Sequence, residues 1–206
     1  MTHVNSKFRK NMDDNYNKIV VFIHGWKGNK HSFESIASIM KIPQTKWFFP
    51  QAPYKMKGDN NQYSWAFENS DGTFDVEKTL ISFTDFITNN ILSLIDSKKV
   101  FFIGFSQGAT MCYDFILQLE YPWGGVFPIA GFKRNKNLFF NIHKNQMNTP
   151  IVIGHGINDD VIPLSSSENI YKELGLNNYN VSFEKFNGGH KININFLKKI
   201  TPIING

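Results

Sequence analysis

The sequence predicts a single α/β domain with a mostly parallel central sheet and helices on both faces. Three observations lead to this prediction: the chain has 206 residues, apolar runs alternate with helical patterns along it, and most of these runs are continuous. A chain of this length is the size of one domain with a substantial core. Continuous apolar runs are typical of strands buried on both faces, and their alternation with helices is typical of a doubly wound sheet.

The expected strands are short runs rich in β-branched and aromatic residues, most of which end at Gly, Pro or polar residues. In chain order they are 19–23, 47–49, 100–105, 125–130, 151–153 and 180–186. The expected helices lie between or after these runs. They are 76–94, where Val76, Leu80, Phe83, Ile87, Ile91 and Leu94 recur at helical spacing, and then 109–119, 166–174 and 191–200.

Two segments fall outside this alternation. The first 17 residues are polar, so we expect an N-terminal segment 1–17 followed by an α/β domain over 18–206. Segment 55–75, from Lys55 to Asp75, is rich in Asn, Gly and Asp and predicts a long surface excursion. Long loops of this kind often form a lid or the rim of a site.

Composition excludes several classes of protein. The net charge is +5, but the Lys residues are scattered and no nucleic-acid-binding motif accompanies them, so we expect no nucleic-acid partner. No stretch approaches the roughly 20 apolar residues of a membrane span, so we expect no stable membrane insertion. A single Cys indicates a reducing compartment, and the N-terminus has no apolar signal region. We therefore expect a cytoplasmic protein.

The most informative motif is Gly104-Phe105-Ser106-Gln107-Gly108, which stands between an expected strand and an expected helix. A Gly-x-Ser-x-Gly sequence in this context predicts a nucleophile elbow, a tight turn that lifts the serine hydroxyl above the sheet edge. Taken alone, Ser106 could equally be a small polar residue in a turn. The context makes it the candidate nucleophile.

Partners for Ser106 follow in the order acid and then histidine, each after a later strand. Asp159 and Asp160 come in the loop after strand 151–153, and His190 follows Gly188-Gly189 after the last strand. The carboxyl ends of parallel strands meet at one edge of a sheet, so these side chains are expected to converge. The carboxylates could instead stabilise the loop, and His190 could be a surface histidine.

Two further histidines, His24 and His155, also follow or end strands, and we interpret them as structural hydrogen-bonding groups rather than bases. Neither shows metal-ligand spacing with other ligand residues, so we expect no metal and no cofactor.

Several motifs together resemble the phospholipase/carboxylesterase family of α/β-hydrolases, which includes the acyl-protein thioesterases. The resemblance runs from about Lys18 to the helix after His190, and Gly-Phe-Ser-Gln-Gly is its most specific part. The other matching stretches are His24-Gly25-Trp26-Lys27-Gly28, Phe49-Pro50-Gln51-Ala52-Pro53, Ser64-Trp65, Gly156-Ile157-Asn158-Asp159-Asp160-Val161-Ile162-Pro163 and Gly188-Gly189-His190.

The resemblance implies roles for individual residues. The family's pattern Gly-x-x-Asp-x-Val-x-Pro places the catalytic acid at Asp159 and leaves Asp160 at a variable position. Its oxyanion hole corresponds here to the backbone N–H groups of Trp26 and Gln107. The chain departs from the family at Trp26, which could narrow the acyl channel, and beside Trp65, at the rim of the site. We therefore expect Trp26 and Trp65 to contact the substrate.

The combined expectation is a serine hydrolase that cleaves carboxylic esters through Ser106, His190 and Asp159 by an acyl-enzyme, with a preference for short to medium acyl chains. Its expected substrates are small-molecule or lipid esters, and the resemblance adds thioesters, lysophospholipids and acylated proteins. The alternative is a catalytically silent α/β-hydrolase that binds a lipid or another small ligand.

Overall fold

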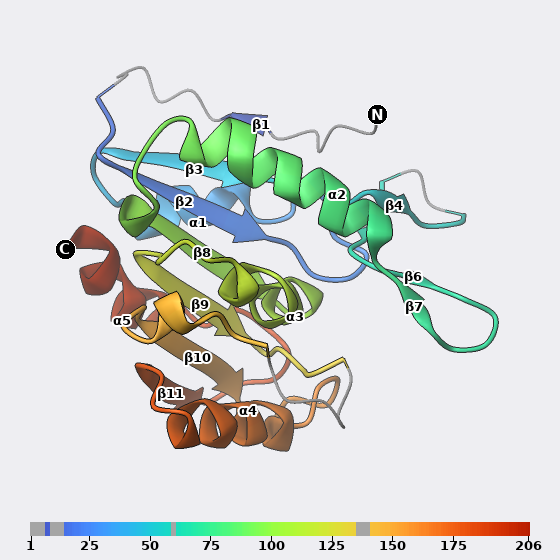
Figure 1. Cartoon of the computed structure of the whole chain (residues 1–206). Coiled ribbons are helices and arrows are strands. Elements are labelled where there is room, and N and C mark those ends of the chain that lie inside the picture. The colour runs from blue at the N-terminus through green and yellow to red at the C-terminus, as the bar shows by residue number, and fades with distance from the viewer. Residues whose placement is uncertain (1–6, 9–14, 59–60, 135–140) are drawn as a thin grey trace.

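The structure, a computed structural model, describes residues 7–8, 15–58, 61–134 and 141–206 (Figure 1). Its central sheet has the order β1-β3-β2-β8-β9-β10-β11. All neighbouring strands from β3 to β11 are parallel, and only β1 pairs antiparallel, with β3. The predicted fold class is confirmed.

Each predicted strand is present in the sheet, with small changes in its ends. The strands are β2 (Lys18–Ile23), β3 (Thr45–Phe49), β8 (Val100–Phe105), β9 (Gly125–Ile129), β10 (Ile151–Gly156) and β11 (Val181–Phe186). β10 runs three residues beyond the predicted end because its pairing with β11 continues to Gly156. Residue 154 has no room for a side chain, because a Cβ there would lie 2.5 Å from the ring of Phe196.

Helices cover both faces of the sheet, as Figure 1 shows. α1 (Glu34–Met40) and α5 (Ile194–Asn205) pack on one face. α2 (Glu77–Asp85), α3 (Gln107–Asp114) and α4 (Leu164–Leu176) pack on the other. Within β2, Ile19, Val21 and Ile23 face the second group of helices, whereas Val20 and Phe22 face the first. This burial on both sides explains why the apolar runs are continuous.

The helix predicted over 76–94 forms in two parts. α2 continues directly into a π-helix, η1 (Phe86–Leu92). Phe83, Ile87 and Ile91 are buried as predicted, but Leu80 and Leu94 are exposed. Thr79 takes the inward position instead of Leu80, because its hydroxyl donates to the carbonyl of Trp65 at 2.7 Å. The wider turns of the π-helix also shift the apolar stripe around the axis.

The other helices differ from prediction mainly at their ends. The helix expected over 109–119 is α3 followed by a short 3₁₀ turn, η3 (Ile116–Gln118). The helix expected over 166–174 is longer at both ends in α4. The one expected over 191–200 begins later, at Ile194, and ends later, at Asn205, in α5. α1 was not predicted. Two further 3₁₀ turns are η2 (Ser97–Lys99) and η4 (Lys144–Gln146).

The two segments outside the predicted alternation carry short strands. β1 (Lys7–Phe8) joins the edge of the central sheet, although it lies in the segment that we expected to precede the domain. The Lys55–Asp75 excursion contains two small antiparallel pairs. They are formed by β4 (Tyr54–Lys55) with β5 (Tyr63–Ser64), and by β6 (Phe67–Glu68) with β7 (Phe74–Asp75).

Candidate active site

Ser106 lies between β8 and α3 in a strained backbone conformation. Its φ is 55° and its ψ is −116°, a combination that residues with a side chain seldom adopt. The turn is held by the amide of Ser106, which donates to the carbonyl of Ile129 on β9 at 2.9 Å, and by the amide of Thr110, which donates to the carbonyl of Ser106. Backbone strain of this kind, maintained by its surroundings, is typical of a nucleophile elbow.

The two glycines of the motif are required by close packing rather than by positive φ. A Cβ on Gly104 would lie 2.3 Å from the carbonyl oxygen of Gly108, and a Cβ on Gly108 would lie 2.1 Å from that of Ile23. Because these neighbours are backbone atoms, they have no freedom to move aside. The first turn of α3 can therefore sit directly against β8 and β2, which brings Ser106 to the sheet edge.

We predict that Gly108→Ala destabilises the protein by about 3 kcal/mol, because overpacking against backbone forces a main-chain shift. The melting temperature should fall by roughly 6–12 °C. Gly175→Ala is the matched control, since no atom lies within 4 Å of its added Cβ in α4. It should stabilise the helix by about 0.5–1 kcal/mol. Equal melting temperatures for the two variants would contradict this account of the motif.

Asp159 and His190 meet at the same edge of the sheet. His190 Nδ1 lies 2.7 Å from Asp159 Oδ2, and the Asp159 side chain is fully buried. The two loops are held together by the amide of Asn158, which donates to the carbonyl of Gly188 at 3.0 Å. Asp160 is exposed. Of the two carboxylates, the structure thus brings Asp159 and not Asp160 to the histidine.

The environment of Asp159 favours its ionised form. Burial opposes the charge, but the amides of Ile162 and Val161 both donate to Oδ1 at 2.9 Å, and His190 pairs with Oδ2. These donors outweigh burial and hold the pKa of Asp159 below its usual value. Because the Asp159 carboxylate accepts a hydrogen bond from Nδ1, the proton of neutral His190 stays on that nitrogen. The lone pair of Nε2 is then free.

His190 also packs beside the residue that precedes the nucleophile. The rings of His190 and Phe105 lie 4.8 Å apart between centroids. Among the described residues there is no hydrogen bond between Ser106 and His190. In unliganded enzymes this bond is often long, and it shortens when substrate binds.

Two backbone amides are the candidate oxyanion donors. The N–H of Gln107 belongs to the first turn of α3, where amides have no acceptor within the helix. Trp26 follows β2 and belongs to the loop that packs on the elbow, since a Cβ on Gly25 would lie 3.2 Å from Ser106 Cβ. Both residues border the same cleft as Ser106.

The cleft has a volume of about 530 Å³ and is lined by Ser106, Gln107 and mostly apolar side chains. The Lys55–Asp75 excursion forms one wall, with Phe67 and Phe74 exposed on it. Trp26 also lines the cleft, with 56% of its surface exposed, and the Lys27 ammonium lies over its ring. The remaining lining residues are Tyr54, Lys55, Met56, Lys57, Ser64, Ala66, Glu68, Phe132, Val161 and Ile162.

Trp65 does not contact the cleft, and our expectation that it binds substrate is corrected. Its side chain is fully buried: the indole Nε1–H donates to the carbonyl of His24 at 2.8 Å, and its ring packs on Phe83. Its backbone N–H donates to the Gln107 side-chain Oε1 at 2.9 Å. Trp65 therefore fixes the base of the excursion to the elbow.

The side chain of Gln107 makes structural contacts that the sequence did not predict. Oε1 accepts from Trp65, and Nε2 donates to the hydroxyl of Ser64 at 2.9 Å. The residue after the nucleophile thus anchors the cleft wall that begins at Ser64. No periodicity or motif in the chain points to this contact, because the two segments are about 40 residues apart.

His24 and His155 both make buried hydrogen bonds, as expected. His24 Nδ1 donates to the carbonyl of Gly25 at 2.8 Å, and its Nε2 accepts from the amide of Ala52. Burial lowers the pKa of His24 to about 4. His155 contacts Ser167, Ile162 and Asp159.

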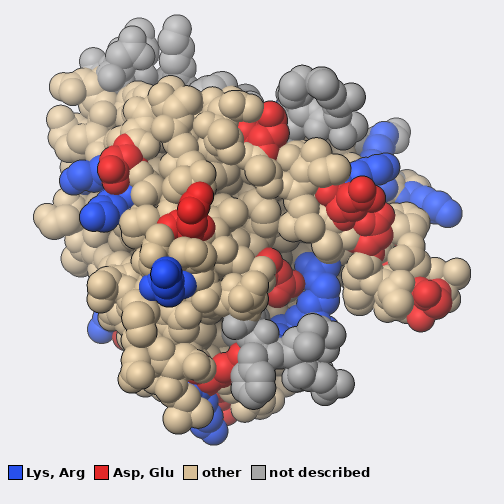
Figure 2. All heavy atoms as spheres, in the orientation of Figure 1, with Lys and Arg blue, Asp and Glu red and all other residues tan. Residues whose placement is uncertain are grey.

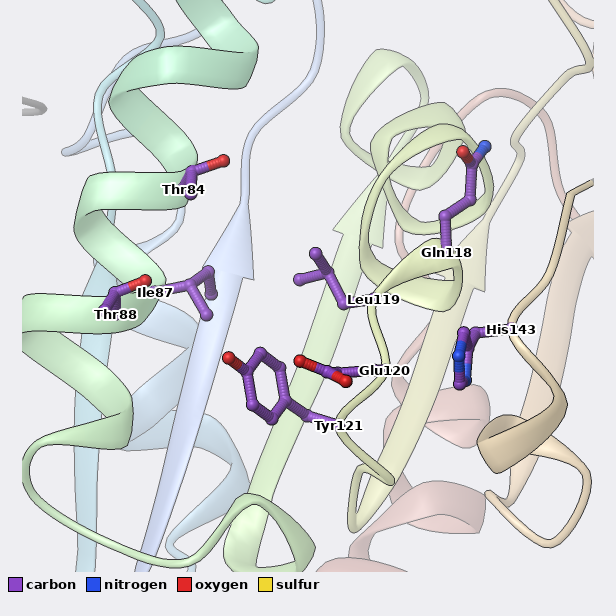
Figure 3. A pocket seen from close by; sticks show the side chains of 8 residues that line it. All are labelled: Thr84, Ile87, Thr88, Gln118, Leu119, Glu120, Tyr121 and His143. Atoms are coloured by element: carbon purple, nitrogen blue, oxygen red, sulfur yellow. The ribbon is translucent and has the colours of Figure 1, made fainter.

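Two other hollows described in the structure, one of about 280 Å³ and one of about 520 Å³ along α2 and η1, are not lined by the candidate catalytic residues. On the face drawn in Figure 2, basic and acidic side chains are interspersed. The smaller of the two hollows lies between η1 and segment 118–121, and Figure 3 shows Thr88 and Tyr121 on opposite sides of it. Within the ranges that the structure describes, no helix is both long and apolar enough to cross a membrane.

Comparisons with known proteins agree with the fold and the motifs. The sequence profile of the family described as Phospholipase/Carboxylesterase matches residues 7–205. Acyl-protein thioesterase 1 of Kluyveromyces lactis is 31% identical over 166 residues, which cover 72% of each protein. The crystal structure of esterase PE8 has a TM-score of 0.85 at 20% identity and covers 98% of both chains. That of Zea mays acyl-protein thioesterase 2 has a TM-score of 0.74 at 16% identity and covers 97% of both.

Proposed function

The chain belongs to the phospholipase/carboxylesterase family, and on that premise we propose that it hydrolyses carboxylic esters and thioesters through a Ser106–His190–Asp159 triad. Hydrolysis of esters or thioesters is the type of activity named for its relatives, among them an acyl-protein thioesterase. The observation that supports the triad is the 2.7 Å contact between Asp159 and His190, whose ring packs on Phe105, the residue before Ser106.

The proposed reaction begins when His190 Nε2 takes the proton of the Ser106 hydroxyl as Oγ attacks the acyl carbon. The carbonyl electron pair moves to oxygen, and the amides of Gln107 and Trp26 donate to the resulting oxyanion. Each such donor is worth about 10²–10³ in rate. Asp159 orients the imidazole and stabilises its charged form.

The tetrahedral intermediate then collapses with loss of the alcohol or thiol, which receives the proton from His190. The acyl group is left on Ser106 Oγ as an ester. His190 takes a proton from a water molecule, which attacks the acyl carbon. The bond from that carbon to Ser106 Oγ then breaks, Oγ takes the proton back from His190, and the carboxylic acid leaves. The chain itself supplies every catalytic group in this scheme, so the proposed reaction uses no cofactor.

The cleft favours an acyl chain of short to medium length as the substrate's apolar part. Phe132, Val161 and Ile162 are among the apolar side chains that line it together with Ser106, and Trp26 lines it as well. Two exposed lysines, Lys55 and Lys57, also line the cleft and can meet a polar or anionic part of the substrate. Lipid esters, lysophospholipids and acylated proteins combine these features. We place the enzyme in the cytoplasm, in keeping with its single Cys.

The experiment that tests this function is a series of nitrophenyl esters and matched thioesters with increasing acyl length. We expect the wild type to have its highest kcat/KM on short to medium chains. Trp26→Ala should raise kcat/KM for the longer chains by about tenfold relative to the short ones, as expected for a bulky group removed from a pocket. Trp26→Phe is the matched control, which keeps an aromatic ring. An unchanged chain-length profile in Trp26→Ala would show that Trp26 does not limit the channel, and no turnover of any ester or thioester would contradict the proposed function.

A further inference from the structure

His155 lies directly behind the proposed catalytic acid. It is the fifth residue of β10, and its side chain is fully buried. Four residues later the chain reaches Asp159, so β10 and the acid loop bring the imidazole back against the carboxylate. His155 is not among the residues that line the cleft.

The contacts of His155 determine where its proton resides. Nε2 lies 2.9 Å from the carbonyl oxygen of Ile162 and 3.4 Å from Asp159 Oδ2. Both are acceptors, so Nε2 must carry a proton. Nδ1 lies 2.7 Å from the hydroxyl of Ser167, a buried residue of α4.

The surroundings keep the imidazole neutral. The groups that face it are Asp159 on its own loop, His190 on the loop after β11, and Glu168 on α4, which is itself paired with Lys185 of β11 at 2.6 Å. Burial is the largest influence and lowers the pKa of His155. In the neutral form with the proton on Nε2, Nδ1 is an acceptor, so Ser167 must donate to it.

We propose that His155 is a positioning residue for Asp159: the Ile162 carbonyl fixes its tautomer, Ser167 on α4 fixes the orientation of its ring, and its Nε2–H holds the 159–162 loop so that Asp159 Oδ2 faces His190. The line of contacts runs from Ser167 through His155 to the carbonyl of Ile162 in the acid loop. Asp159 Oδ2 lies 2.7 Å from His190 Nδ1 and 3.4 Å from His155 Nε2. Asp159 Oδ1 is occupied by the amides of Val161 and Ile162, so the loop that His155 ties down is the same loop that orients the carboxylate. This role rests on the triad proposed above.

The test compares His155→Leu, which removes the donor, with His155→Gln, whose amide N–H can reach the position of Nε2. We expect His155→Leu to lower kcat by about 10–10² with KM changed less than twofold, the size expected for a small misplacement of a catalytic group. His155→Gln should recover kcat to within about threefold of wild type. Ser167→Ala should lower kcat by roughly threefold to tenfold, whereas Ser165→Ala, exposed on the same helix, should leave it unchanged.

A second measurement reads the Asp159–His190 contact itself. The Nδ1 proton of His190, hydrogen-bonded to a carboxylate, should give a low-field ¹H NMR signal in the wild type. We expect this signal to shift upfield or broaden in His155→Leu and to remain in His155→Gln. A folded His155→Leu protein with unchanged kcat, or with lower kcat but an unchanged signal, would overturn the proposal. So would a rise in KM alone, which would mean that His155 acts on the cleft through Ile162.

If the His155 variants do not fold, Ser167→Ala decides the question. Equal kcat and an equal NMR signal in Ser167→Ala and Ser165→Ala would overturn the role of the Ser167–His155 contact. The NMR readout also separates this proposal from the proposed function. A wild-type protein that turns over no ester or thioester contradicts the function, but its His190 signal still reports whether His155 positions Asp159.

Discussion

Replacing Ser106 with Ala is expected to lower kcat for ester hydrolysis by about 10⁶, because the members of a triad act as a unit and the loss of the nucleophile removes the acyl-enzyme route. Ester turnover by the purified variant, compared with wild type, measures this effect. The substitution removes only the hydroxyl from a buried residue, so the melting temperature should change little. A folded variant that keeps activity within about tenfold of wild type would contradict the assignment of Ser106 as the nucleophile.

Asp159→Asn is expected to lower kcat by about 10⁴, since an amide in place of the carboxylate favours the wrong tautomer of the histidine. In the wild-type structure, His190 Nδ1 lies 2.7 Å from Asp159 Oδ2. An amide nitrogen there would donate to Nδ1 and move the histidine's proton to Nε2, so His190 could no longer accept the proton of Ser106.

Asp160→Asn is the matched control for this substitution. Asp160 is exposed and adjacent in sequence, so the change from carboxylate to amide should leave kcat within about twofold of wild type. The pair of kcat values, measured on one ester at one pH, separates the two carboxylates. A severe effect at Asp160 with a mild effect at Asp159 would reverse our choice of acid.

Much of the fold could be predicted because its strands are buried on both faces. The continuous runs at 19–23 and 100–105 have no polar face, and each corresponds to a strand in the middle of the sheet. The order of the candidate site residues was also readable from the sequence. Ser106, Asp159 and His190 each follow a strand, and parallel strands bring such positions to one edge.

Features that depend on contacts between distant segments could not be predicted. Trp65 has the appearance of a substrate-binding residue beside a divergent motif, yet its indole pairs with the carbonyl of His24, and only the tertiary structure brings these residues together. Thr79 replaces Leu80 on the inner face of α2 because the carbonyl of Trp65 needs a donor. α1 is only seven residues long and too short to give a periodic signal.

The central claim is that Ser106 is activated by His190 and Asp159, and labelling with a fluorophosphonate probe tests it most directly. The probe forms a covalent bond with an activated serine, and peptide mapping by mass spectrometry locates it. We predict a single label on Ser106 in the wild type, its loss in Ser106→Ala and strongly slowed labelling in His190→Ala. A folded wild-type protein that stays unlabelled, or that is labelled at another residue, would contradict the account and favour a catalytically silent ligand-binding protein.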